Sequence, residues 1–176
     1  MRNSTPNPLP RIVAACAVGL LSLTIAGCVY QLGSSLPPNL KTVYVPMFIN
    51  QCGEPQVENE TTQAAIAEFQ RDGALEVVPS ANEADLVVDV TLSSYKLEPL
   101  RYEKDQAKTT KEYRLRIAAD MVVRKTRAQT VPTTNSVAGE ATFLVSGDLT
   151  SSKRIALPAA ARDLAHKIVQ SITEAW

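Results

Sequence analysis

The chain has 176 residues, with 18 basic side chains, 18 acidic side chains and one histidine, so its formal net charge is zero. This balance gives no reason to expect a nucleic-acid partner, which would favour a basic protein. One histidine leaves no Ser/His/Asp or Cys/His set to assemble, and no Cys/His cluster has the spacing of a zinc site. We therefore expect no enzyme, no catalytic residues, no metal and no cofactor.

The first 27 residues have the composition of a secretory signal peptide. Arg2 and Arg11 are the only charges before Cys28. The apolar run that follows Arg11 has about 15 residues, whereas a membrane-spanning helix needs about 20. Two small residues, Ala26 and Gly27, precede Cys28, whose thiol can take a diacylglyceryl group. We predict that the signal peptide is residues 1–27 and that Cys28 carries a lipid; the alternative is an ordinary signal peptide with a chance cysteine.

Cleavage before Cys28 would leave a tether over residues 28–40 and a single periplasmic α+β domain over residues 41–176. Gly33, Pro37 and Pro38 exclude a helix or a central strand from the tether. The mature chain has 16 basic and 18 acidic side chains. Cys52 is its only cysteine besides Cys28, so no intramolecular disulfide can form. We expect Cys52 to be a buried or half-buried free thiol; an intermolecular bridge is the alternative.

The first half of the domain predicts a strand, a helix and a second strand. Residues 42–45 are β-branched and aromatic, and Pro46 limits this strand. A helix capped by Asn59 or Thr61 is expected to run to about residue 72, because apolar residues recur there at helical spacing. Gly73 suits the left-handed residue that ends a helix. Residues 75–78 predict the next strand.

The second half predicts three longer strands and a C-terminal helix. Residues 86–93, 113–124 and 137–145 alternate between apolar and polar side chains, as strands with one buried face do. Pro99 is expected to limit pairing, and residues 128–136 to connect two strands. Asp85 and Asp89 flank a strand, as a cap and an exposed residue. The expected apolar face of the last helix is Leu157, Ala161, Leu164, Ala165, Ile168, Ile172 and Ala175 or Trp176.

The resulting order, β-α-β-β-β-β-α, predicts the fold class. Strands with a single apolar face need a cover, which two amphipathic helices provide. We expect an α+β two-layer sandwich, with a mostly antiparallel sheet of four to five strands and both helices packed on one face. His166 lies off the apolar stripe of its helix, which favours a solvated side chain over a catalytic base.

One segment, residues 96–127, has a marked positive charge. It contains ten basic and five acidic side chains, so it is net +5 and the rest of the mature chain is net −7. Lys and Arg pair well with phosphate, so a basic hairpin could bind an anionic partner. The alternative is a solvated hairpin whose charged faces form salt bridges and discourage sheet-to-sheet aggregation.

Two runs near the start of the predicted mature chain, Cys28-Val29-Tyr30-Gln31-Leu32 and LPPNLKTVYVPMFIN at 36–50, carry a resemblance to a known family. They resemble the LptE family of lipopolysaccharide-assembly lipoproteins, whose start reads Cys-Gly-Tyr-x-Leu, with Val29 here in place of glycine. The run LPPNLKTVYVPMFIN at 36–50 is similar to its Leu-Pro-x-x-(Ile/Leu)-Lys-Thr-(Ile/Val)-x-Val-Pro-x-Phe-x-Asn. More general likenesses are Ala84-Asp85-Leu86, Glu112-Tyr113-Arg114-Leu115 and Leu164-Ala165-His166-Lys167-Ile168-Val169.

The resemblance implies a partner and a location. Proteins of this family plug the large β-barrel LptD in the outer membrane, help to assemble it and take part in placing lipopolysaccharide in the outer leaflet. The chain is then expected to be lipid-anchored on the periplasmic side of the outer membrane, as a 1:1 plug that also contacts lipopolysaccharide. Residue 29 is not the Asp that retains enterobacterial lipoproteins on the inner membrane.

If lipid A phosphates meet the basic segment, the residues that we expect to contact lipopolysaccharide are Arg101, Lys108, Lys111, Arg114 and Arg116. Two rival interpretations stay open. One is an outer-membrane lipoprotein that serves as an accessory binding module for cell-wall synthesis or another lipid-transport system. The other is a periplasmic enzyme, which the lack of a catalytic set disfavours.

Overall fold

The computed structural model describes residues 36–103, 106–127 and 131–174. The predicted signal peptide, Cys28, most of the tether and the last two residues lie outside these ranges. The side chains of residues 101–111 are likewise outside the description, so only the backbone of that segment is discussed.

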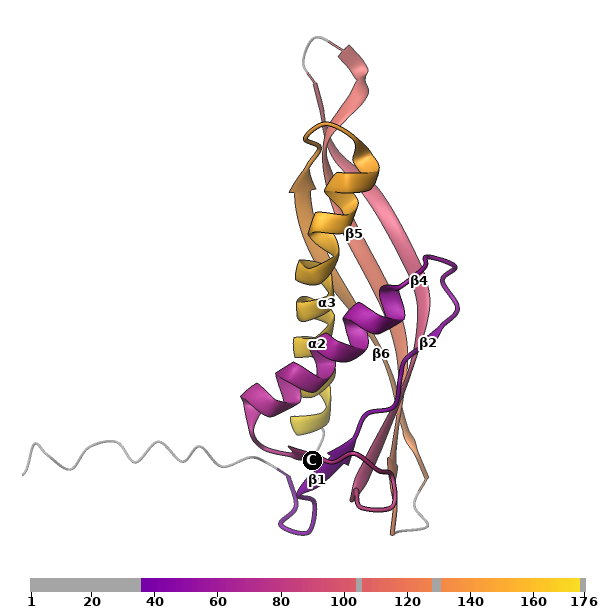
Figure 1. The fold of residues 1–176 in the computed structure, drawn as a ribbon, viewed down its shortest axis with the longest axis vertical. Helices are drawn as coiled ribbons and strands as arrows, with labels where there is room; N and C mark the ends of the chain where they lie inside the picture. Colours follow the sequence, from indigo (N-terminus) through magenta and orange to yellow (C-terminus); the bar gives the residue numbers. More distant parts are fainter. Residues whose placement is uncertain (1–35, 104–105, 128–130, 175–176) are drawn as a thin grey trace, which may run out of the picture. The chain divides into compact units, whose positions relative to one another are not determined.

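Six strands form one mixed sheet in the order β3-β1-β4-β5-β6, with β2 also pairing with β4 (Figure 1). The strands β1 (Thr42–Tyr44), β2 (Ile49–Asn50) and β3 (Glu76–Val77) are short and pair in parallel. The strands β4 (Leu86–Glu103), β5 (Gln106–Lys125) and β6 (Thr133–Leu144) are long and antiparallel. The sheet is thus a long meander with a short parallel extension beside it.

The two helices, α2 (Val57–Asp72) and α3 (Leu149–Thr173), lie on the same face of the sheet (Figure 1). The α+β two-layer fold is therefore confirmed. The expected sheet was smaller and mostly antiparallel, whereas this one has a parallel part. The helix between β2 and β3 carries the chain back along the sheet, so the strands on either side of it run in the same direction.

The core lies between the helices and the inward face of the meander. Alternate residues of β5 from Leu115 to Val123 are buried, as the alternation of the sequence predicts. They pack against α3, whose buried residues include Ala161, Leu164 and Ile168 on the expected face. Phe69 of α2 is also part of this core. The alternating apolar residues of the strand and the apolar stripes of the two helices therefore form one buried layer.

A bulge in β4 explains why this strand is longer than the sequence predicts. The register passes from Leu92 opposite Ala119 to Ser94 opposite Ala118, so Ser93 is an extra residue. The extra residue shifts the alternation, which brings Tyr95 back to the inward face opposite Ile117. The expected strand covers residues 86–93 only, because the alternation of the sequence breaks after Ser93, although the pairing with β5 continues to Glu103.

Pro99 does not end this pairing, contrary to expectation, since it lies opposite Tyr113 in the ladder. The neighbouring strand β2 pairs with β4 only as far as Leu92. Beyond that point β4 is an edge strand on its other side, and an edge tolerates a residue that has no backbone N–H. Strand β6 also begins earlier than expected, at Thr133, within the segment expected to be a connection.

The helix boundaries differ in part from the predictions. Helix α2 begins at Val57, after Gln56 in a left-handed conformation, and no side chain caps it, so the expected caps Asn59 and Thr61 are wrong. Gly73 ends this helix as expected, with a φ of 74° and its N–H donated to Phe69. Helix α3 begins at Leu149, where the Asp148 carboxylate accepts from the N–H of Ser151 at 2.8 Å.

Side chains of α3 cap the outer edge of β6. The Asp163 carboxylate accepts from the N–H of Glu140 at 2.8 Å and from the Lys167 ammonium at 2.8 Å. The same ammonium donates to the carbonyl of Ala138 at 2.8 Å. An exposed strand edge can template pairing with another chain. Here one N–H and one carbonyl in the middle of that edge are bonded within the molecule.

This contact depends on Gly139, which lies between the two capped residues. A Cβ atom on Gly139 would lie 2.4 Å from the carbonyl oxygen of Ala160 and 2.5 Å from Cβ of Leu164. Both obstacles are fixed by the backbone of α3, so no flexible side chain can move away. Glycine therefore sets the distance between β6 and the helix.

We expect Gly139→Ala to lower the free energy of unfolding by about 2–3 kcal/mol or more, because the added methyl group must push α3 away from the sheet. Urea unfolding followed by circular dichroism measures this loss. Gly147→Ala is the control, since nothing lies within 4 Å of its added Cβ and only its φ of +81° opposes the change. Equal stability of Gly139→Ala and the parent chain would contradict the interpretation.

Candidate functional site

The sheet face that points away from the helices carries a set of cross-strand ion pairs. Arg114 of β5 lies 3.8 Å from a carboxylate oxygen of Glu98 and 3.5 Å from one of Glu140. Arg116 also pairs with Glu140, which lies opposite it on β6. Two guanidinium groups therefore share the Glu140 carboxylate, and Glu98 lies at the margin of this group.

The same open face continues toward the other end of β5 with further polar pairs. Arg124 donates two hydrogen bonds, of 2.8 and 2.5 Å, to Asp89 of β4. The Ser136 hydroxyl donates to the Asp120 carboxylate at 2.5 Å. Asp89 is thus on the open face, as expected, but it has a partner. Paired charges and hydroxyl groups thus alternate on the described open face with apolar residues such as Ala118, Val122 and Leu144.

All five residues predicted to contact lipopolysaccharide lie on the β4–β5 hairpin. Arg114 and Arg116 are two residues apart on one face of β5, so the structure brings them together. Arg101 lies in β4, opposite Glu112, and Lys108 and Lys111 lie in β5. The side chains of these three residues are among those not described. The backbone thus places all five predicted residues on one hairpin. For Arg114 and Arg116 the side chains also lie on the same face.

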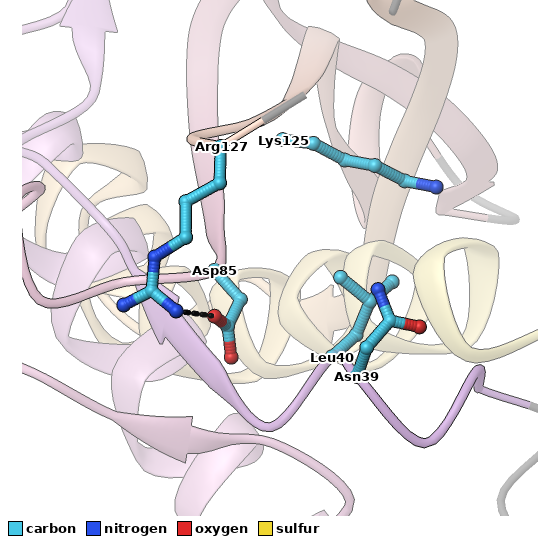
Figure 2. Close-up of a pocket in the computed structure, with 5 residues that line it drawn as sticks. All are labelled: Asn39, Leu40, Asp85, Lys125 and Arg127. Atoms are coloured by element: carbon cyan, nitrogen blue, oxygen red, sulfur yellow. Dashed lines mark ion pairs between the residues drawn. The ribbon is translucent and has the colours of Figure 1, made fainter.

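A second candidate site, which the sequence analysis did not identify, lies where the chain enters the domain. Figure 2 shows this tether-end pocket, about 240 Å³ in volume, which is lined by Asn39, Leu40, Asp85, Lys125 and Arg127. Arg127 forms an ion pair of 3.6 Å with Asp85. The only signal in the sequence was the positive charge at the end of the basic segment.

Asp85 fastens the start of β1 to the start of β4. Its carboxylate accepts from the N–H of Lys41 at 3.0 Å, and from the N–H and hydroxyl of Thr42 at 3.2 and 3.1 Å. The hydrogen bond from Lys41 is the main reason that the pKa of Asp85 lies below its usual value, and Thr42 and the Arg127 charge act in the same direction. Asp85 therefore caps a strand 43 residues away rather than its own turn.

We expect Asp85→Asn to cost on the order of 1–2 kcal/mol at pH 7, because the hydrogen bonds to β1 lose their charged acceptor. A lowered folded-state pKa stabilises the fold above the unfolded-state pKa of about 4, and this contribution is lost as the pH falls through the folded-state value. The stability gap between parent and variant should therefore close below about pH 4. Chemical unfolding at several pH values between 3 and 7 measures the gap.

The matched control is Glu83→Gln, which makes the same charge change on an exposed side chain two residues away. It should leave the free energy of unfolding within about 0.5 kcal/mol of the parent at every pH. A stability gap for Asp85→Asn that persists undiminished at pH 3 would show that the charge of the carboxylate is not what matters.

The single histidine joins the two helices. His166 Nδ1 lies 3.0 Å from Glu68 Oε1, and Arg71 lies 2.7 Å from the same oxygen. The His166 side chain is 60% exposed, in keeping with the expected solvated position, although it has a partner. The arrangement is a helix–helix contact in which one carboxylate oxygen of Glu68 lies beside both the imidazole of His166 and the guanidinium of Arg71.

Cys52 is a free, half-buried thiol, as expected. Its Sγ donates to the side-chain oxygen of Asn50 at 3.1 Å. Nearby, Lys153 of α3 pairs with Glu54 at 2.6 Å and lies 5.6 Å from the centre of the Tyr95 ring. Burial raises the pKa of Tyr95 to about 12. These contacts tie the loop before α2 to α3 and to β4.

No group of three or more His, Cys, Asp and Glu side chains in the described ranges is arranged to hold a metal ion. Neither described helix is long and apolar enough to cross a membrane.

A comparison with protein families finds a match to the family described as "LptE: Lipopolysaccharide-assembly" over residues 40–172. That range includes every described strand and nearly all of α3. It agrees with the resemblance seen in the sequence runs. No curated protein matches the chain.

Two solved structures share the fold at low sequence identity. The rare lipoprotein B from Shewanella oneidensis is 12% identical with a TM-score of 0.51, and the match covers 77% of this chain and 96% of that one. The hypothetical protein CT253 from Chlamydia trachomatis is 10% identical with a TM-score of 0.54, covering 76% of this chain and 96% of that one. At these identities the likeness concerns the fold alone.

Proposed function

The chain belongs to the LptE family of lipopolysaccharide-assembly proteins, and from that premise we propose that it plugs and helps to assemble an LptD-type β-barrel. In this proposal the chain is a lipoprotein of the outer membrane, held on the periplasmic side by the lipid on Cys28. It takes part in the insertion of lipopolysaccharide into the outer leaflet. It acts by binding, without catalysis, cofactor or metal.

The observation that carries the proposal is the family match, which extends over nearly the whole described domain. The open face of the sheet supports the plug role independently. Its charges are paired across strands, as in Arg124 with Asp89 and Arg116 with Glu140. A surface of this kind stays compatible with water, and the interior of a large membrane barrel is polar. An apolar open face would instead favour contact with lipid or with another apolar surface.

Lipopolysaccharide contact is proposed for the β4–β5 hairpin. Arg114 and Arg116 share Glu140, and each guanidinium can offer several N–H donors to phosphate oxygens. Arg101, Lys108 and Lys111 add positive charge on the same hairpin. A lipid A phosphate would approach these two guanidiniums, which share Glu140 and of which Arg114 also lies 3.8 Å from Glu98, and would compete with the carboxylates for their N–H donors.

Purification of the tagged, lipidated protein from native outer membranes in mild detergent tests the plug role. We expect one large β-barrel with an LptD-like periplasmic domain to be recovered in a 1:1 ratio, because a plug is enclosed by its partner. Mass identification and quantitation of the bands give the ratio. Recovery of the chain alone, or with cell-wall synthases, would contradict the proposal and favour an accessory lipoprotein of another class.

Lipopolysaccharide contact is tested separately with Arg114→Gln/Arg116→Gln. We expect about a tenfold or greater loss of affinity, because hydrogen bonds to charged groups are lost. Arg71→Gln/Arg162→Gln is the matched control, since it removes two positive charges from the helices. Equilibrium binding of labelled lipopolysaccharide gives the affinities, and thermal unfolding checks the fold. Equal affinities of the two double variants would contradict the assignment of lipopolysaccharide contact to Arg114 and Arg116.

A further inference from the structure

The tether-end pocket is one of two adjoining hollows at the end of β5. The second hollow, of about 350 Å³, shares Lys125 with the first and is also lined by Arg124. With Arg127, three of the four residues from 124 to 127 are cations that line one or both hollows. We propose that these hollows bind the phosphate-bearing headgroup of an anionic phospholipid, an inference that rests on the lipid anchor of the proposed function.

The charges of the pocket favour an anion. The residues that line the two hollows include three cations, Arg124, Lys125 and Arg127, and one carboxylate, that of Asp85. Asp89 is engaged by Arg124, and Asp85 accepts three hydrogen bonds from the start of β1. The 3.6 Å between Arg127 and Asp85 is longer than a hydrogen bond, and the Arg127 side chain is 77% exposed. The guanidinium is thus near the carboxylate but can turn its donors to an incoming phosphate.

The rest of the lining suits a phospholipid headgroup better than a bare phosphate. Figure 2 shows Arg127 and Lys125 on different sides of the pocket, with Asn39 and Leu40 across from Arg127. An amide side chain can hydrogen-bond a glycerol hydroxyl, while Leu40 offers apolar contact. The second hollow repeats this mixture, with Asn82 beside Val87 and Pro132. Arginine and lysine supply the donors that phosphate oxygens accept.

The length of the tether keeps the pocket near a membrane surface. Leu36, the first described residue, is eight residues after Cys28, and eight extended residues span at most about 28 Å. Asn39 and Leu40, which follow directly, line the pocket. A lipid on Cys28 would therefore hold this end of the sheet within about 28 Å of its anchor, so that the pocket can reach the headgroups, where each nearby Lys or Arg favours binding to anionic lipid.

The test uses the mature, full-length protein in detergent and short-chain phosphatidylglycerol as the probe. Native mass spectrometry counts bound lipid, with short-chain phosphatidylcholine, inorganic phosphate and lipopolysaccharide as the other ligands. We expect phosphatidylglycerol to bind and phosphatidylcholine not to bind. Lys125→Gln/Arg127→Gln should weaken phosphatidylglycerol binding by about 10- to 30-fold. The control Arg154→Gln/Arg162→Gln removes two exposed charges from α3 and should leave binding unchanged.

Any one of the following results would overturn the proposal. Equal binding of phosphatidylcholine would show that charge does not select the ligand. Equal losses in the two double variants would show that the pocket is not the site. Competition by inorganic phosphate at the same concentration, or displacement by lipopolysaccharide that the pocket variant abolishes, would assign the hollows to another phosphate source.

The lipid anchor is checked on the same sample, so that a failure of the proposed anchor on Cys28 can be distinguished from a failure of the proposed headgroup site. The intact mass of the mature protein shows whether Cys28 carries acyl chains. An unacylated Cys28 would contradict the anchor while leaving the headgroup measurement valid, because the short-chain probe binds from solution. An acylated protein that does not bind phosphatidylglycerol would overturn the pocket assignment alone.

Discussion

The rest of the structure depends on the long antiparallel ladder between β4 and β5. One face of the ladder supplies the sheet side of the core, from Leu115 to Val123, and the other face carries the cross-strand ion pairs. A ladder of this length could not keep one apolar face past Leu92 without the extra residue at Ser93, which returns Tyr95 to the helix side. The bulge therefore keeps one face of the sheet apolar and the other polar as β4 continues toward the hairpin end.

The two ends of this ladder carry different chemistry. Toward the hairpin, Arg114 and Arg116 share a carboxylate with an open surface around it. Toward the tether, Asp85 holds β1 against β4, and the cations from 124 to 127 line two hollows. The basic segment seen in the sequence is thus two regions at opposite ends of one hairpin, and each calls for its own ligand experiment.

Much of the fold could be predicted from the sequence, because each strand of the meander has one buried face and alternation records burial. The pattern fails at Ser93, where the bulge breaks the period, and at Ile49–Asn50, which is too short to show one. Parallel pairing is set by the path of α2 and is not encoded in any single strand. The tether-end pocket could not be predicted, since Asn39, Asp85 and Arg127 meet only when the sheet forms.

The capping of β6 by Asp163 and Lys167 limits how the molecule can join others at this edge. The Glu140 N–H and the Ala138 carbonyl are already bonded to side chains of α3, so an arriving strand could pair with neither group. A partner built from strands, including the proposed barrel, would meet this stretch of the edge through side chains such as Asp163 and Lys167. A contact of that kind can be altered one side chain at a time, because neither backbone has to change its register.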